Sequence, residues 1–213
     1  MRLDHVSYVA SHEQISDVVN RIGSQIGTAF VDGGIHPKFG TRNFTAPLLN
    51  GQYIEIVCPL DHPATDATPF GRAVKKKADD GGGWLSWILA TNEISKIEKR
   101  LGRKSISGSR RKPDGIELNW KQIGVLGTLE DAQLPFFVEW ISSSHPSMDG
   151  MAIAKISKIE IVGSLEKITS WTDNSDLVEA LGSCELKVEK NLNEFNGITS
   201  VHFGLKGQTV SIS

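Results

Sequence analysis

The sequence predicts an α+β fold made of two tandem modules with the order strand, helix and three strands (βαβββ), followed by a partial third module. Three observations support this prediction: residues 5–23 align without a gap with residues 84–102, residues 53–57 match residues 137–141 around a central glutamate, and each unit is followed by a His-Pro pair. A repeated supersecondary unit determines the architecture of a chain. We therefore expect modules over residues 1–80, 81–151 and 152–213.

Each of the first two modules opens with an apolar-rich strand and a helix. In the first module, apolar residues recur at helical spacing from Ile15 to Ile22, and Gly23 is expected to cap the helix. The second copy repeats this pattern and ends at Gly102. The Asn50-Gly51 pair predicts a hairpin turn between two further strands.

The last part of the chain is weakly similar in sequence to the start of the same unit. It begins near Lys158 and predicts a helix over residues 165–172. Residues 187–189, 201–205 and 209–212 are typical of strands. We expect this partial third module to pack on the first two.

The composition is that of an ordinary globular protein, with 39% hydrophobic residues, 23% charged residues and a net charge of -2. The basic runs at residues 75–77 and 110–112 are short and lie beside acidic residues, so we expect solvated loops there and no nucleic-acid partner. The sequence shows no signal-peptide pattern, no paired cysteine spacing and no apolar stretch of the roughly 20 residues that span a bilayer. These observations predict a cytoplasmic protein without a membrane partner.

Strand alternation identifies the residues that face a cleft. Residues two apart on a strand share a face, so Tyr53 and Glu55 are together and the apolar residues between them point the other way. The same parity predicts that Glu139 lies on the cleft face of the second module, and that His5 and Ser7 lie together on the opening strand. A carboxylate among apolar neighbours needs a partner.

The paired modules, the opening residues Leu3-Asp4-His5-Val6 and the closing residues Tyr53-Ile54-Glu55-Ile56 resemble the vicinal-oxygen-chelate superfamily of glyoxalases, bleomycin-resistance proteins and extradiol dioxygenases. Residues 36–43 followed by residues 53–55 resemble, more narrowly, bacterial glyoxalase-like domain proteins. The resemblance implies that the modules form an open, glyoxalase-like cleft. It also implies that any metal is held by the first and last strands of each module, at His5, Glu55, Trp84 and Glu139.

Tryptophan cannot ligate a metal, so the expected ligands are His5, Glu55 and Glu139. One imidazole and two carboxylates suit one divalent ion of Fe, Mn, Ni or Zn, and no organic cofactor is expected. Such an ion would support a lyase, isomerase or dioxygenase acting on a small oxygen-rich substrate, with Glu139 as base. His36, in a Gly/Pro loop, is a further candidate base or substrate contact at the cleft mouth.

A metal-free protein that binds and sequesters a small molecule is the alternative. There the two glutamates would be satisfied by His5, Asn43 or other polar partners, and Trp84 and Tyr53 would be aromatic walls of the pocket. Asn43 and Ser7 are also expected to contact the substrate, with the Asn43 side chain orienting a substrate oxygen. A homodimer, and a partner-binding role for the third module, also stay open.

Overall fold

The order of a strand, a helix and three strands occurs twice along residues 2–140 of the computed structural model, which describes residues 1–190 and 196–213. The first copy comprises β1 (Arg2–Val9), α1 (Ile15–Ile26), β2 (Val31–His36), β3 (Thr41–Leu48) and β4 (Gln52–Pro59). The second comprises β5 (Gly83–Ala90), α4 (Ile94–Leu101), β6 (Ile106–Arg111), β7 (Glu117–Ile123) and β8 (Phe136–Trp140). The α+β fold with tandem βαβββ modules is therefore confirmed.

The eight strands form a closed barrel in the order β1-β4-β3-β2-β6-β7-β8-β5. Strand β1 pairs in parallel with β4 and antiparallel with β5, so it joins the two copies. An open cleft was expected, but β2 and β6 meet where Ile35 pairs with Arg111. This pairing closes the barrel and leaves it without a free sheet edge.

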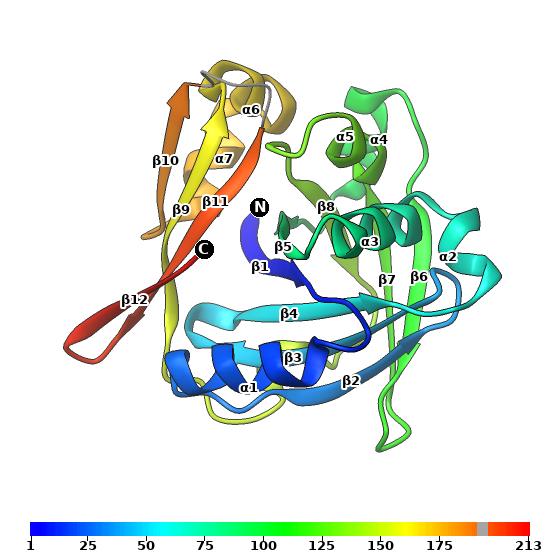
Figure 1. Cartoon of the computed structure of the whole chain (residues 1–213). Helices are drawn as coiled ribbons and strands as arrows, with labels where there is room; N and C mark the ends of the chain where they lie inside the picture. Colours follow the sequence, from blue (N-terminus) through cyan, green and yellow to red (C-terminus); the bar gives the residue numbers. More distant parts are fainter. Residues whose placement is uncertain (191–195) are drawn as a thin grey trace.

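Short helices fill the connections between the strands: η1 (Leu49–Gly51), α2 (Pro63–Ala67), α3 (Pro69–Asp79), α5 (Val125–Glu130) and η2 (Pro146–Met148). Helix α3 begins where the Thr68 side chain accepts a hydrogen bond from the Gly71 amide, with Pro69 in the first turn. It packs against β1, β4, β5 and α5 (Figure 1), and its Phe70 and Val74 are buried in the core on the inner side of the barrel. The basic run at residues 75–77 therefore lies on a helix, and the predicted loop is wrong.

The C-terminal part forms a separate four-stranded sheet beside the barrel (Figure 1). Its elements are β9 (Lys155–Gly163), α6 (Leu165–Thr172), α7 (Asn174–Leu181), β10 (Glu185–Lys190), β11 (Gly197–Leu205) and β12 (Gln208–Ile212). The helix expected over residues 165–172 is present as α6. In the strand order, β10-β9-β11-β12, β9 pairs in parallel with the next strand along the chain, β10, whereas β1 pairs in parallel with the last strand of its own copy. The third unit thus resembles the element order of the repeat, with a second helix added, but has a different topology.

The C-terminal sheet covers the outer face of β1 and β5. The Trp84 ring stacks on Phe203 of β11 with centroids 6.4 Å apart, and its indole N–H donates to the Ile212 carbonyl at 2.9 Å. One apolar core therefore runs from the outer face of the barrel into this sheet. No helix within residues 1–190 and 196–213 is long and apolar enough to cross a membrane.

Replacement of Phe203 by alanine tests this packing. Phe203 is fully buried, so Phe203→Ala leaves a cavity and is expected to lower the free energy of unfolding by about 3–5 kcal/mol in urea denaturation. Val178→Ala is the control, because Val178 is 69% exposed and its truncation should change this free energy by less than about 0.5 kcal/mol. Equal effects of the two substitutions would contradict the packing.

Candidate functional site

A small cavity lies inside the barrel. Its volume of about 30 Å³ is enough for one or two water molecules. Five polar residues and five apolar ones line it: His5, His36, Tyr53, Glu55 and Gln122, with Phe70, Trp120, Phe136, Val138 and Trp140. The first copy of the repeat contributes most of the polar groups, whereas β7 and β8 supply most of the aromatic and apolar wall.

The Glu55 carboxylate is held by two short hydrogen bonds. Ser7 on β1 donates its hydroxyl to one oxygen, and Asn43 on β3 donates its amide N–H to the other, each at 2.7 Å. Burial acts to raise the pKa of Glu55, but attraction to the imidazoles of His5 and His36, together with these two hydrogen bonds, outweighs burial and lowers the pKa. Glu55 is therefore a fixed, charged carboxylate at neutral pH.

A buried arginine compensates this carboxylate through Asn43. Arg110 on β6 is 2% exposed, and its guanidinium donates to the Asn43 side-chain oxygen at 3.3 Å and to the Gly33 carbonyl. A Cβ at Gly33 would collide with both Asn43 and Arg110, so glycine is needed for this close approach. The solvated loop expected at residues 110–112 is thus wrong for Arg110, whose side chain points into the barrel from β6.

His5 is fixed by Tyr53 and Asp4. Its ring stacks on Tyr53 with centroids 4.2 Å apart, its Nε2 lies 3.3 Å from the Tyr53 hydroxyl, and its Nδ1 lies 3.0 Å from Asp4 Oδ2. Burial, with added repulsion from the charges of Asp4 and Glu55, raises the pKa of Tyr53 well above its ordinary value. The tyrosine therefore presents a protonated hydroxyl to His5.

The Asp4 carboxylate is the centre of a further network. It is fully buried and lies 2.6 Å from the Arg2 guanidinium, 3.1 Å from the Trp140 indole nitrogen and 3.2 Å from His145 Nε2. Burial would raise the pKa of Asp4, but the hydrogen bonds from His145 and His5 and the nearby positive charges lower it far below the ordinary range. Asp4 was not predicted as a site residue from the sequence, although an acid beside His5 on an apolar strand was the available signal.

His36 lies at the end of β2 inside the cavity, whereas the sequence placed it in a loop over the cleft mouth. It is 3% exposed, and its Nδ1 lies 2.9 Å from the Thr41 hydroxyl. The rings of Phe39, Phe70 and Trp120 pack edge-on around the imidazole. Burial lowers its pKa to about 4 against the opposing attraction of Glu55, so His36 is neutral at physiological pH.

Gln122 carries an unpaired hydrogen-bond donor at the cavity wall. Its side-chain oxygen accepts from the Trp120 indole N–H at 2.8 Å, which orients the Nε2 group away from the indole. Gln122 is 3% exposed, and Nε2 has no hydrogen-bond partner among the described residues. Buried polar groups are nearly always paired, so an unpaired one requires an explanation. Gln122 was not predicted as a site residue. It lies two residues after Trp120 on β7 and so shares its face, which could have indicated that Gln122 points into the barrel.

The structure places Glu139 outside the cavity. Phe137 and Glu139 do share a face of β8, as expected, but that face is the outer one. The Glu139 carboxylate lies 3.8 Å from Lys121 Nζ and 3.5 Å from the Ile94 amide. Both faces of β8 carry large apolar residues, so the sequence pattern did not fix which face points inward. A shift of one residue along the strand exchanges the two faces.

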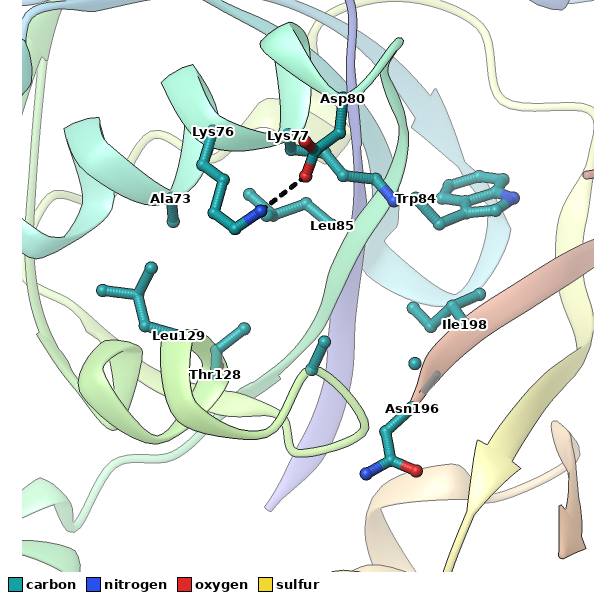
Figure 2. Close-up of a pocket in the computed structure, with 12 residues that line it drawn as sticks. Ala73, Lys76, Lys77, Asp80, Trp84, Leu85, Thr128, Leu129, Asn196 and Ile198 are labelled. Carbon is teal, nitrogen blue, oxygen red and sulfur yellow. Dashed lines mark hydrogen bonds and ion pairs between the residues drawn. The ribbon is translucent and has the colours of Figure 1, made fainter. Parts of the chain in front are cut away.

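Trp84 also lies outside the cavity. The register between β1 and β5 shifts at this point, since Ser7 pairs with Ser86 whereas Tyr8 pairs with Trp84. The extra residue of this bulge, Leu85, turns Trp84 to the outer face. Trp84 instead lines a second pocket beside α3, shown in Figure 2.

The residues present do not fit the divalent metal implied by the resemblance. Of the three expected ligands only His5 and Glu55 reach the cavity. Both oxygens of Glu55 already accept hydrogen bonds, and the two ring nitrogens of His5 face Asp4 and Tyr53. Within residues 1–190 and 196–213 no group of three or more His, Cys, Asp or Glu side chains is placed to hold a metal ion.

The buried His36 predicts a pH-dependent stability. Its folded-state pKa of about 4 lies below the ordinary 6.5, so the unfolded chain binds the extra proton first and stability is lost as the pH falls from 6.5 towards 4. Between pH 6.5 and 4.5 the wild type should lose about 2–3 kcal/mol more free energy of unfolding than His36→Gln in urea titrations. Parallel pH profiles for the two proteins would contradict the neutral, buried state of His36.

Comparison with known proteins identifies the fold family. The model of the glyoxalase-like domain family matches residues 3–179. A hypothetical protein from Staphylococcus aureus has a similar structure, with a TM-score of 0.67 and 15% identity over 100% of this chain and 98% of that protein. Methylmalonyl-CoA epimerase from Mycobacterium tuberculosis aligns with a TM-score of 0.43 and 14% identity, over 65% of this chain and 86% of the epimerase.

The search of curated proteins gives no match. At 15% identity, the likeness to the Staphylococcus aureus protein shows the fold alone. The family match covers most of the chain, over the same residues that form the barrel and part of the C-terminal sheet. This chain therefore belongs to the glyoxalase-like domain family.

Proposed function

We propose that this protein binds a small, neutral, oxygen-bearing molecule in the barrel cavity without a metal ion. The observation that carries the proposal is the Gln122 Nε2 group, a buried donor at the cavity wall with no partner among the described residues. A ligand oxygen that accepts from this group would remove the cost of leaving it unpaired.

Other groups at the cavity complement such a ligand. Neutral His36 lines the cavity with Nδ1 directed at Thr41, so its Nε2 is available to donate or accept. The Tyr53 hydroxyl is a second polar contact, and Phe70 and Trp120 add aromatic walls. The charged Glu55 in the same lining disfavours an anionic ligand, which is why we propose a neutral one.

Trp140 separates this cavity from a larger space. The cavity of about 30 Å³ holds no organic molecule, but Trp140 also lines an outer pocket of about 390 Å³ that includes Arg2, Asn92 and His145. We propose that rotation of the Trp140 side chain joins the two spaces and admits the ligand. Its indole N–H bond to Asp4 would then hold the closed position.

A metal-dependent lyase, isomerase or dioxygenase is the competing function. It needs carboxylate oxygens directed at an ion, and here Ser7 and Asn43 occupy both oxygens of Glu55 while Glu139 lies on the opposite face of β8. These contacts favour the metal-free binding function.

Titration with hydroxyacetone, a small neutral probe with two oxygens, tests the proposal. In ¹H–¹⁵N NMR spectra the side-chain amide signals of Gln122 should shift on binding, because the carbonyl oxygen accepts from Nε2. Gln133 is an internal reference: it is 1% exposed, but its Nε2 already donates to Asp131 at 2.8 Å, so its signals should not move.

Matched variants complete this experiment. Gln122→Met should weaken hydroxyacetone binding about tenfold, the effect of losing one buried hydrogen bond. Gln208→Met changes an exposed glutamine on β12 and should leave binding unchanged. Unaltered binding by Gln122→Met, or no binding by the wild type, would show the proposal to be wrong.

A further inference from the structure

A second pocket lies between the barrel and the C-terminal sheet, with a volume of about 200 Å³. Helix α3, strand β5, helix α5 and the start of β11 surround it (Figure 2). It shares no lining residue with the barrel cavity. We refer to it as the α3 pocket.

Among the described residues, one cation of the α3 pocket makes no ion pair. Lys76 pairs with Asp80 at 2.7 Å, so these two charges compensate each other. Half-buried Lys77 extends from α3 toward Trp84 (Figure 2), and within the described residues it makes no ion pair. Burial also lowers the pKa of Lys77, because the charged form loses hydration there. Among the described residues that line it, the pocket therefore has one more lysine than carboxylates.

The remaining walls of the pocket are largely apolar. Leu85 projects from β5, Leu129 from α5 and Ile198 from β11, and Ala73 lies on α3 above Leu129 in the view of Figure 2. The buried ring of Trp84 forms one side. A single cation at the edge of an apolar hollow matches a molecule with one anionic end and a hydrocarbon body.

We propose that the α3 pocket binds a small amphipathic carboxylate, with its headgroup on Lys77 and its hydrocarbon part against Leu85, Leu129 and Ile198. A monoanion matches the one lining lysine that makes no ion pair among the described residues. A dianion such as a phosphate ester would carry a second charge with no cation left for it, near the carboxylate of Asp80.

Isothermal titration of the full chain with octanoate, compared with 1-octanol as its neutral counterpart, tests this site. We expect saturable binding of octanoate and at least tenfold weaker binding of octanol. Lys77→Gln should weaken octanoate binding about tenfold and leave octanol binding unchanged, since it removes only the charge.

Lys75→Gln is the matched control. Lys75 lies on the same helix, pairs with Asp66 at 2.7 Å and does not line the pocket, so its loss should not affect octanoate binding. Equal weakening by both lysine variants, equal affinity for octanoate and octanol, or no octanoate binding would overturn the proposal. Gln122→Met should bind octanoate like the wild type, which separates this test from that of the barrel cavity.

Discussion

The antiparallel pairing of β1 with β5 is the interaction on which the rest of this structure depends. It joins the two copies of the repeat, and each of the two strands also pairs in parallel with the last strand of its own copy. Both faces of β1 are buried, so its side chains contribute both to the barrel interior and to the outer apolar core. His5 and Ser7 point into the barrel, whereas Val6 and Tyr8 belong to the core shared with the C-terminal sheet.

The barrel interior contains two buried charges, Glu55 and Arg110, that are connected by hydrogen bonds through a neutral amide. Glu55 and Arg110 make no direct contact. The side-chain amide of Asn43 lies between them: it donates to Glu55 and accepts from Arg110. A buried ion is costly unless its hydrogen-bonding capacity is used, and this arrangement uses both oxygens of Glu55. The same pairing makes Glu55 a poor metal ligand, and the neutral groups of Gln122 and His36 are then the ones available to a guest molecule.

Much of the fold could be predicted because repetition is visible in the sequence. Aligned apolar patterns gave both βαβββ copies, and alternation on β4 brought Tyr53 and Glu55 to the inner face together with His5 and Ser7. Asn43 was also expected near the site, and it binds Glu55. These predictions succeeded where one strand face is polar and the other is apolar.

Prediction failed where the order of apolar and polar residues does not show which face of a strand points into the barrel. Both faces of β8 carry large apolar residues, so Glu139 was assigned to the inner face although it lies on the outer one. On β5, a bulge at Leu85 turns Trp84 to the opposite face from the one predicted. Neither the packing of α3 against the inner core of the barrel nor the Gln122 amide, which has no partner among the described residues, has a local signature in the sequence. Both depend on contacts between elements distant in sequence.

The most direct test of the central claim, that the barrel cavity functions without a metal, is elemental analysis combined with calorimetric titration of Mn²⁺, Fe²⁺, Ni²⁺ and Zn²⁺. The protein should be purified without chelators and compared with Glu55→Gln. We expect no stoichiometric metal that depends on Glu55. One equivalent of tightly bound metal in the wild type that disappears in Glu55→Gln would contradict it.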